Sequence, residues 1–219
     1  YGITNRVYTD CIVSIAEGNA RIAMLAGKLA ADSESLAAIQ DASDLYHNYY
    51  SKQLTALIES DTGVRSAGII AFIQAIHLNH LEKLASIFEV AGISGSDFKS
   101  DLKLLHRAEI VDLCNDEAAR ISDQSFSNFL IKYVFVEEKI IPLGTMIETC
   151  FQMNKSRTIE ACNILLNVFS DQSVREYVES QIKIVWDKLE SNVKKFLPFF
   201  KAFHMVRPTQ TLLLLQEYI

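Results

Sequence analysis

The chain has 219 residues, and its 21 Lys and Arg against 27 Asp and Glu give a net charge of −6 at pH 7. That acidic balance argues against a nonspecific nucleic-acid binder, which would carry a basic surface. Hydrophobic residues make up 49% of the chain, and 8 glycines and 3 prolines are few enough to favour a mainly helical globular fold. No apolar run approaches the ~18 residues that a membrane span needs, so we expect no membrane contact.

Residues 1–61 predict a small helical bundle. Apolar side chains recur over 5–17, a Gly-Asn pair interrupts them, and a second helix follows over 20–31. The second helix is apolar around most of its circumference, which is typical of a helix buried on several sides. A polar loop and a third helix over about 41–60 complete the bundle, and the segment 61–63 marks its boundary.

Residues 62–141 predict a winged helix. Apolar residues of 69–76 repeat the helical spacing i, i+3, i+4, i+7, and two further helices follow, the second of which Ser96 can cap. The period falls to two over 111–121, which indicates a small β-hairpin. A closing helix that starts at Ser122 completes the arrangement of three helices, a hairpin and a helix.

Residues 142–219 predict a C-terminal helical connector. We expect helices over about 145–153, 156–169 and 172–196, with Pro198 ending the last and Pro208 opening a terminal helix. Between these prolines lies an apolar knot of Phe199, Phe200, Phe203 and Met205. The predicted fold is therefore mainly α: a helical bundle, a winged helix with a small hairpin, and a helical connector.

The cysteines and the first residues suggest where the protein works. Cys11, Cys114, Cys150 and Cys162 form no CxxC pair, so we expect free thiols in the reducing cytoplasm. The chain opens at Tyr1 directly into a helical pattern, and we therefore expect it to be a piece of a longer cytoplasmic protein.

The turn before the second helix is the first candidate site. Gly18 can end one helix and Asn19 can cap the next, which leaves the free N–H groups of a helix N-terminus beside Arg21. Backbone donors, the positive end of a helix dipole and a guanidinium are the groups that bind a polyphosphate. The competing interpretation is a plain helix–helix corner with a solvated arginine.

Two other patterns lack the residues that their chemistry needs. Gly27-Lys28 lies inside a helix, and Leu29 stands where a phosphate-binding loop needs Ser or Thr. His77 and His80 are three residues apart, whereas a helical metal site uses histidines four apart. We therefore expect neither a Walker-type loop nor a metal site in this chain.

The net charge of the predicted winged helix indicates whether it could bind DNA. Residues 62–123 contain six Lys or Arg and nine Asp or Glu, a net charge of 6 − 9 = −3. A protein that reads DNA should be locally cationic, because a duplex carries about one charge per ~1.7 Å. Lys99, Lys103 and Arg107 do form a single basic stripe, although Asp97 and Asp101 flank it.

Taken in order, these segments resemble the STAND class of P-loop NTPases, which is related to AAA+ proteins. Gly18-Asn19-Ala20-Arg21 before an alanine-rich helix resembles the sensor segment in the lid of these NTPases, and a winged helix follows that lid. Residues 119–123, which lead into the closing helix, resemble the end of that winged helix, and 203–212 look like the connector toward a sensor region. The resemblance is to bacterial STAND ATPases, including those of antiviral (anti-phage) defence.

The resemblance implies a nucleotide-dependent signalling switch. Residues 1–61 would be the helical lid, with Arg21 approaching the phosphates of ATP or ADP and Gly18 and Asn19 presenting it. Asp123 would match the aspartate of the Met-His-Asp motif, whereas Ser122 departs from its histidine and Ala20 from the usual proline. The nucleotide domain of the same chain would supply Mg, and a protein or ligand trigger at a distal sensor would drive ATP exchange and self-association.

Two other functions stay open. The chain could be a helical adaptor that binds a protein through 172–196 and the aromatic knot, or a winged-helix regulator of transcription. The segment holds neither a phosphate loop nor a set of metal carboxylates, so any ATPase activity would belong to the parent chain.

Overall fold

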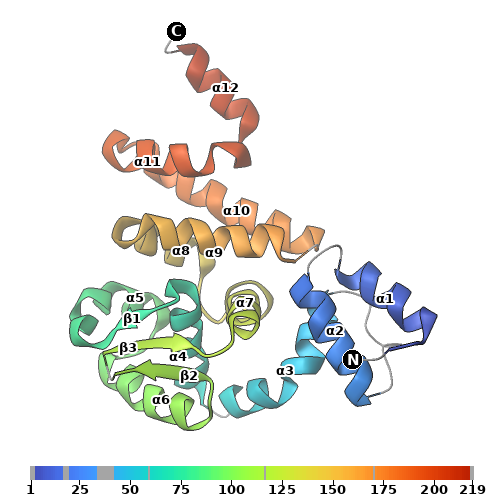
Figure 1. The fold of residues 1–219 in the computed structure, drawn as a ribbon. Coiled ribbons are helices and arrows are strands. Elements are labelled where there is room, and N and C mark those ends of the chain that lie inside the picture. Colours follow the sequence, from blue (N-terminus) through green and yellow to red (C-terminus); the bar gives the residue numbers. More distant parts are fainter. Residues whose placement is uncertain are drawn as a thin grey trace.

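The computed structural model describes the chain over residues 3–16, 20–33, 42–58, 60–115, 117–169 and 171–217. As the sequence predicts, this part of the chain is mainly helical and contains a small β-hairpin; a third strand that was not predicted extends the hairpin to an antiparallel sheet of three strands (Figure 1). Within these ranges, no helix combines the length and the apolarity needed to cross a membrane.

The N-terminal bundle consists of α1 (Arg6–Ala16), α2 (Ala20–Ser33) and α3 (Ala42–Ile58), close to the three predicted helices. Helices α1 and α2 pack against each other, and α3 extends from them toward the rest of the molecule (Figure 1). Lys28 of α2 donates a 2.7 Å hydrogen bond to the Tyr49 hydroxyl of α3. The lysine that the sequence shows inside a helix therefore joins two helices of the bundle.

The next elements form what we call the winged-helix unit, which runs from α4 to β3. It consists of α4 (Asp61–Ile73), β1 (Ile76–His77), a 3₁₀ helix η1 (Leu78–Leu84), α5 (Ala85–Ala91), α6 (Gly95–Arg107), β2 (Val111–Cys114) and β3 (Ala118–Ile121). The sheet order is β1-β3-β2, with Val111 opposite Ile121 and Ile76 opposite Ala119. These four apolar residues are buried, whereas Asp112 and Arg120 between them are not.

Three details of the winged-helix unit differ from the sequence prediction. Ser60 caps α4, so residues 61–63 form its first turn and the break falls one residue earlier. Helix α4 then ends at Ile73, because Gln74 adopts φ 71°, and the expected helical residue Ile76 belongs to β1. Ser94, and not Ser96, caps α6, in a reciprocal capping box with Asp97.

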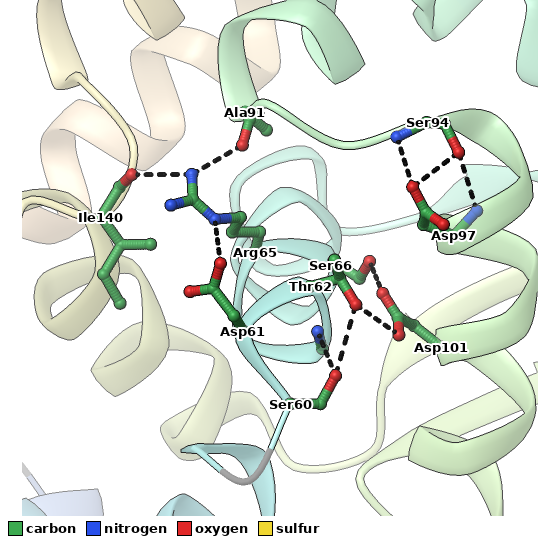
Figure 2. Close-up of polar contacts among 11 residues, drawn as sticks. Ser60, Asp61, Thr62, Arg65, Ser66, Ala91, Ser94, Asp97, Asp101 and Ile140 are labelled. Atoms are coloured by element: carbon green, nitrogen blue, oxygen red, sulfur yellow. Dashed lines mark hydrogen bonds and ion pairs between the residues drawn. The ribbon is translucent and has the colours of Figure 1, made fainter.

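Asp101 is buried on α6 and joins this helix to α4 (Figure 2). Ser66 Oγ donates to Asp101 Oδ2 at 2.6 Å, and Thr62 Oγ1 donates to Oδ1 at 3.0 Å. A buried carboxylate requires such donors, because an unsatisfied polar group costs ~1–3 kcal/mol or more. Asp101 is thus an internal link and contributes little to the exposed face of α6.

Arg65 of α4 connects three separate parts of the chain (Figure 2). Its Nη1 donates to the carbonyl of Ala91 at 2.7 Å and to the carbonyl of Ile140 at 3.2 Å, while Nε lies 3.5 Å from Asp61 Oδ2. The two carbonyls belong to the end of α5 and to the segment that leads to the C-terminal helices. One guanidinium therefore holds that segment against the winged-helix unit.

The closing helix α7 (Gln124–Lys132) continues into a π-helical turn, η2 (Tyr133–Glu137). Helix α7 packs on α4, and Gly68 of α4 allows Val134 of η2 to approach closely. A Cβ on Gly68 would lie 2.7 Å from Val134 Cγ1, closer than two carbon atoms can approach without movement. Asp123 caps α7, so the helix begins one to two residues later than predicted.

The C-terminal helices stack on one another above the winged-helix unit, and α12 lies farthest from it (Figure 1). They are α8 (Leu143–Met153), α9 (Lys155–Asn167), α10 (Gln172–Leu189), α11 (Val193–Phe203), the 3₁₀ turn η3 (His204–Val206) and α12 (Pro208–Glu217). The predicted apolar seam of α10 is buried, from Val178 to Leu189. Pro208 opens α12, as the sequence predicts.

The predicted helix over 172–196 is wrong, because the chain breaks after Leu189 and Asn192 caps a new helix. Pro198 lies inside α11 and does not end a helix. Because proline has no N–H, the carbonyl of Lys194, four residues earlier, lacks its α-helical donor. Lys194 is exposed, so water can reach this part of the helix. Of the predicted apolar knot, Phe199 and Phe203 are buried, whereas Met205 is 75% exposed.

Candidate functional site

The structure describes two of the five predicted site residues in full. Gly18 and Asn19 lie outside the described residues, and Arg21 is in the first turn of α2 with its side chain outside the description. Ser122 and Asp123 lie between β3 and α7, and Asp123 contacts Tyr50 in the middle of α3. The junction between the N-terminal bundle and α7 is therefore where the predicted site can be examined.

Asp123 binds both helices at this junction. Its Oδ1 accepts the N–H of Phe126 at 2.7 Å, which caps α7, and the hydroxyl of Tyr50 from α3, also at 2.7 Å. Burial and the hydrogen bond to Asp123 raise the pKa of Tyr50 above its ordinary value. The phenol therefore stays protonated and donates its hydrogen throughout the physiological pH range.

Ser122 points to the hairpin and hydrogen-bonds there. Its hydroxyl donates to Asp112 Oδ1 at 3.0 Å, and its N–H donates to the carbonyl of Ile110 at 2.9 Å. The other oxygen of Asp112 lies 3.3 Å from Arg120 Nη2. Ser122 thus binds the hairpin and the residue before it, whereas Asp123 binds α3 and α7, although the two residues are adjacent in sequence.

A second polar group, His47–Glu137–Lys132, crosses the same junction. His47 Nε2 of α3 lies 2.9 Å from Glu137 Oε2, and Lys132 Nζ of α7 lies 2.6 Å from Glu137 Oε1. Lys132 is almost completely buried, and its ammonium also lies 5.2 Å from the centre of the Phe169 ring. Burial alone would raise the pKa of Glu137, but the hydrogen bonds from His47 and Lys132 outweigh it and lower the pKa to about 2.

Aromatic rings fill the space between the two polar groups. The edge of His47 meets the Phe129 ring with 4.9 Å between centres, and Tyr50 lies 4.7 Å from Phe126. The rings of this cluster are Tyr46, His47, Tyr50, Phe126, Phe129, Tyr133 and Phe169. The junction is therefore a packed interface with two polar links, rather than a cavity that could hold a substrate.

Asp123 could be singled out from the sequence, whereas its partners could not. Tyr50 is 73 residues away from Asp123, and His47 is 90 residues away from Glu137. The spacing of residues within one helix or strand gives no information about contacts between residues so far apart in the sequence. A charged pair at Lys132 and Glu137 within a hydrophobic stretch was the available signal, because charges are seldom placed among apolar residues without a partner.

The polar contacts of this junction hold neighbouring elements in place. In the portion of the chain that the structure describes, no three His, Cys, Asp or Glu side chains converge in a way that could hold a metal ion. The two carboxylates that join α3 to α7, those of Asp123 and Glu137, are each bound by two groups of the protein itself. What the junction can do is couple the position of α3 to that of α7.

Comparison with protein-family models, with curated proteins and with solved structures found no match.

Proposed function

We propose that this chain is the lid and winged-helix portion of a nucleotide-dependent signalling switch of the STAND type. In this proposal residues 1–61 are the lid, 62–141 the winged-helix domain and 142–219 the connector to a sensor region. The order of the elements supports it: a helical bundle, a winged-helix unit and stacked C-terminal helices follow one another along the chain.

The observation that carries the proposal is the position of Asp123. This residue matches the aspartate of the motif at the end of the winged helix in STAND proteins, and here it hydrogen-bonds Tyr50 of the bundle. A residue at this point can transmit the position of the lid to the winged helix, which is what a nucleotide switch requires. A ligand shifts such an equilibrium only by binding the two states with different affinity.

Arg21 is the residue that we expect to supply this difference in affinity. It lies in the first turn of α2, where the N–H groups of a helix start and a guanidinium both favour phosphate. ATP or ADP, with Mg held by a nucleotide domain, would bring the phosphate charge. The hydroxyl of Ser122 is donated to Asp112, and we therefore leave it out of the phosphate contacts.

The test uses the full-length protein and two matched arginine substitutions. Arg21→Ala should weaken binding of ADP by about tenfold or more, because a charge-assisted contact is worth ~1.5–3 kcal/mol. Arg6→Ala removes an exposed arginine of α1 and should leave the affinity unchanged. The readouts are the nucleotide released from the purified protein and titration with fluorescent ADP, with circular dichroism as the folding control.

Equal ADP affinity in the wild type and Arg21→Ala would overturn the role of Arg21. Absence of both nucleotide binding and ATP-dependent self-association in the full-length protein would overturn the proposal as a whole.

A second candidate function is nucleic-acid binding by α6, and a specific observation favours it. Lys99, Lys103 and Arg107 are all exposed on this helix, while Asp101 points inward to Ser66. The exposed stripe is thus more basic than the sequence suggests. In helix-turn-helix folds the corresponding helix lies in the major groove.

A duplex titration at two salt concentrations distinguishes the two candidates. Binding by α6 should weaken steeply with salt and should be lost in a Lys99→Glu, Lys103→Glu variant. A switch without nucleic-acid function would show no shift with the duplex at low salt.

A further inference from the structure

A cavity of ≈ 250 Å³ lies where the winged-helix unit meets α8 and α9. Its walls come from the end of α4, from β1 and η1 on one side, and from the end of α8 and the start of α9 on the other. The floor is apolar and consists of Phe72, Ile76, Ile87 and Cys150. Small-molecule sites combine such apolar walls with a few polar groups and often lie between structural units.

The ionisable side chains that line this cavity are all basic. They are His77, His80, Lys83 and Arg157, joined by the neutral polar side chains of Asn154 and Thr158, and none of the described residues that line it is Asp or Glu. This selection is notable because the whole chain has 27 acidic against 21 basic residues. Each imidazole carries at least one N–H in any protonation state. His80 Nδ1 lies 3.3 Å from Glu82 Oε1, so Nε2 is the nitrogen of His80 that is left for an anion, whereas His77 and Lys83 have no acidic partner among the residues that the structure describes.

The two cations at the cavity are held differently. Arg157 Nη1 donates to the side-chain oxygen of Gln74 and lies 2.6 Å from Glu160 Oε2, so its guanidinium is fixed in place. Lys83 forms no hydrogen bond or ion pair with the part of the chain that the structure describes, and its side chain is exposed. Lys83 can therefore turn to a ligand without giving up an internal contact.

We propose that this cavity binds a small amphipathic anion, with an apolar body on the floor and one carboxylate or phosphate among the four donors. The basic side chains of the lining favour an anionic headgroup, and the apolar floor favours an apolar body of the ligand. A neutral or cationic molecule of the same shape would satisfy only the floor. The ligand would contact the winged-helix unit and α9 together, and the inference does not depend on a nucleotide function of the chain.

The probe is decanoate, used below its micellar concentration and followed by calorimetry and by ligand-observed NMR. We expect saturable binding with one site, and at least about fivefold weaker binding of decanol and decylammonium, which keep the apolar body but lose or reverse the charge. Decyl phosphate serves as the second anion, and whichever anion binds more tightly identifies the headgroup. No saturable binding of either anion at millimolar concentration would overturn the proposal.

Two matched substitutions locate the site. Lys83→Glu should weaken decanoate binding at least about fivefold, whereas Lys103→Glu, the same change on the exposed face of α6, should have no effect. Met153→Trp should block the cavity, because Met153 lines it and is 42% exposed, so a larger side chain fits there without repacking the core. Equal effects of Lys83→Glu and Lys103→Glu, or undiminished binding in Met153→Trp, would show that the anion binds elsewhere and would overturn the assignment.

Discussion

The hydroxyl of Tyr50 and the N–H of Phe126 donate to the same oxygen, Asp123 Oδ1, each at 2.7 Å. One carboxylate oxygen thus caps α7 and holds α3 against it. Any movement of the N-terminal bundle away from α7 must break the hydrogen bond from Tyr50, while the cap can remain.

Tyr50→Phe removes this hydrogen bond and keeps the aromatic ring. We expect the free energy of unfolding to fall by about 1.5–3 kcal/mol, the usual range for a hydrogen bond to a charged group. Tyr49→Phe is the matched control, because its hydroxyl meets Lys28 in a more exposed setting, where such contacts contribute ~0–1 kcal/mol. Urea unfolding of both variants measures the difference, and equal losses would contradict the special role of Tyr50.

The Glu137 link predicts that the junction is sensitive to acid. The folded protein lowers the pKa of Glu137 from an ordinary value near 4.5 to about 2, so its ionised form is favoured by folding. The resulting stabilisation, on the order of 3 kcal/mol, is present above pH 4.5 and is lost as the pH falls from 4.5 toward 2.

Glu137→Gln separates this effect from other acidic groups. The variant leaves Lys132 buried without its carboxylate and should be destabilised at neutral pH. Its difference in unfolding free energy from the wild type should shrink as the pH falls below 4.5. A difference that stays constant between pH 7 and pH 3 would argue against a depressed pKa.

The close contact between Gly68 and Val134 predicts that the stability effects of substitutions at these two positions are coupled. Gly68→Ala should cost about 1–3 kcal/mol, because its new Cβ would lie 2.7 Å from Val134 Cγ1. In a Val134→Ala background the same substitution should cost much less, since the colliding methyl is absent. A double-mutant cycle by thermal or urea unfolding measures the coupling, and additive losses would contradict the close approach.

The cysteines predict two classes of reactivity. Burial raises the pKa of both Cys150 and Cys162 to about 12, so these thiols stay protonated and react slowly at neutral pH. Cys114 is exposed and Cys11 is half-buried. A thiol reagent should therefore label Cys114 and Cys11 in the folded protein and the other two only after unfolding. Rapid labelling of Cys162 in the folded protein would show that the core is open.

Much of the fold could be predicted from periodicity, because amphipathic helices and half-buried strands each repeat their apolar residues at a characteristic spacing along the sequence. The hairpin over 111–121 and the buried seam of α10 are confirmed for this reason. Elements fixed by single backbone conformations were missed: Gln74 ends α4 with φ 71°, and Asn192 starts a helix where a continuous one was expected. Such positions carry no periodic signal.

The candidate site was less predictable than the fold. Asp123 was singled out only by its resemblance to the motif at the end of the winged helix, and its role as the N-cap of α7 was not expected. Its contact with Tyr50 depends on how the bundle packs against α7, a relationship between residues 73 positions apart. The inward turn of Asp101 was missed for the same reason, because its partners Thr62 and Ser66 belong to another helix.

The π-helical turn at Tyr133–Glu137 has a geometric consequence for the ion pair between Lys132, which precedes it, and Glu137. Residues five apart diverge by about 140° around a regular α-helix, whereas the wider π turn brings the side chains of Lys132 and Glu137 to the same side. The extra residue of the wide turn is therefore what closes the contact. If the same residues wound as a regular α-helix, the helix would persist, but the carboxylate would turn away and leave Lys132 without its partner in the interior.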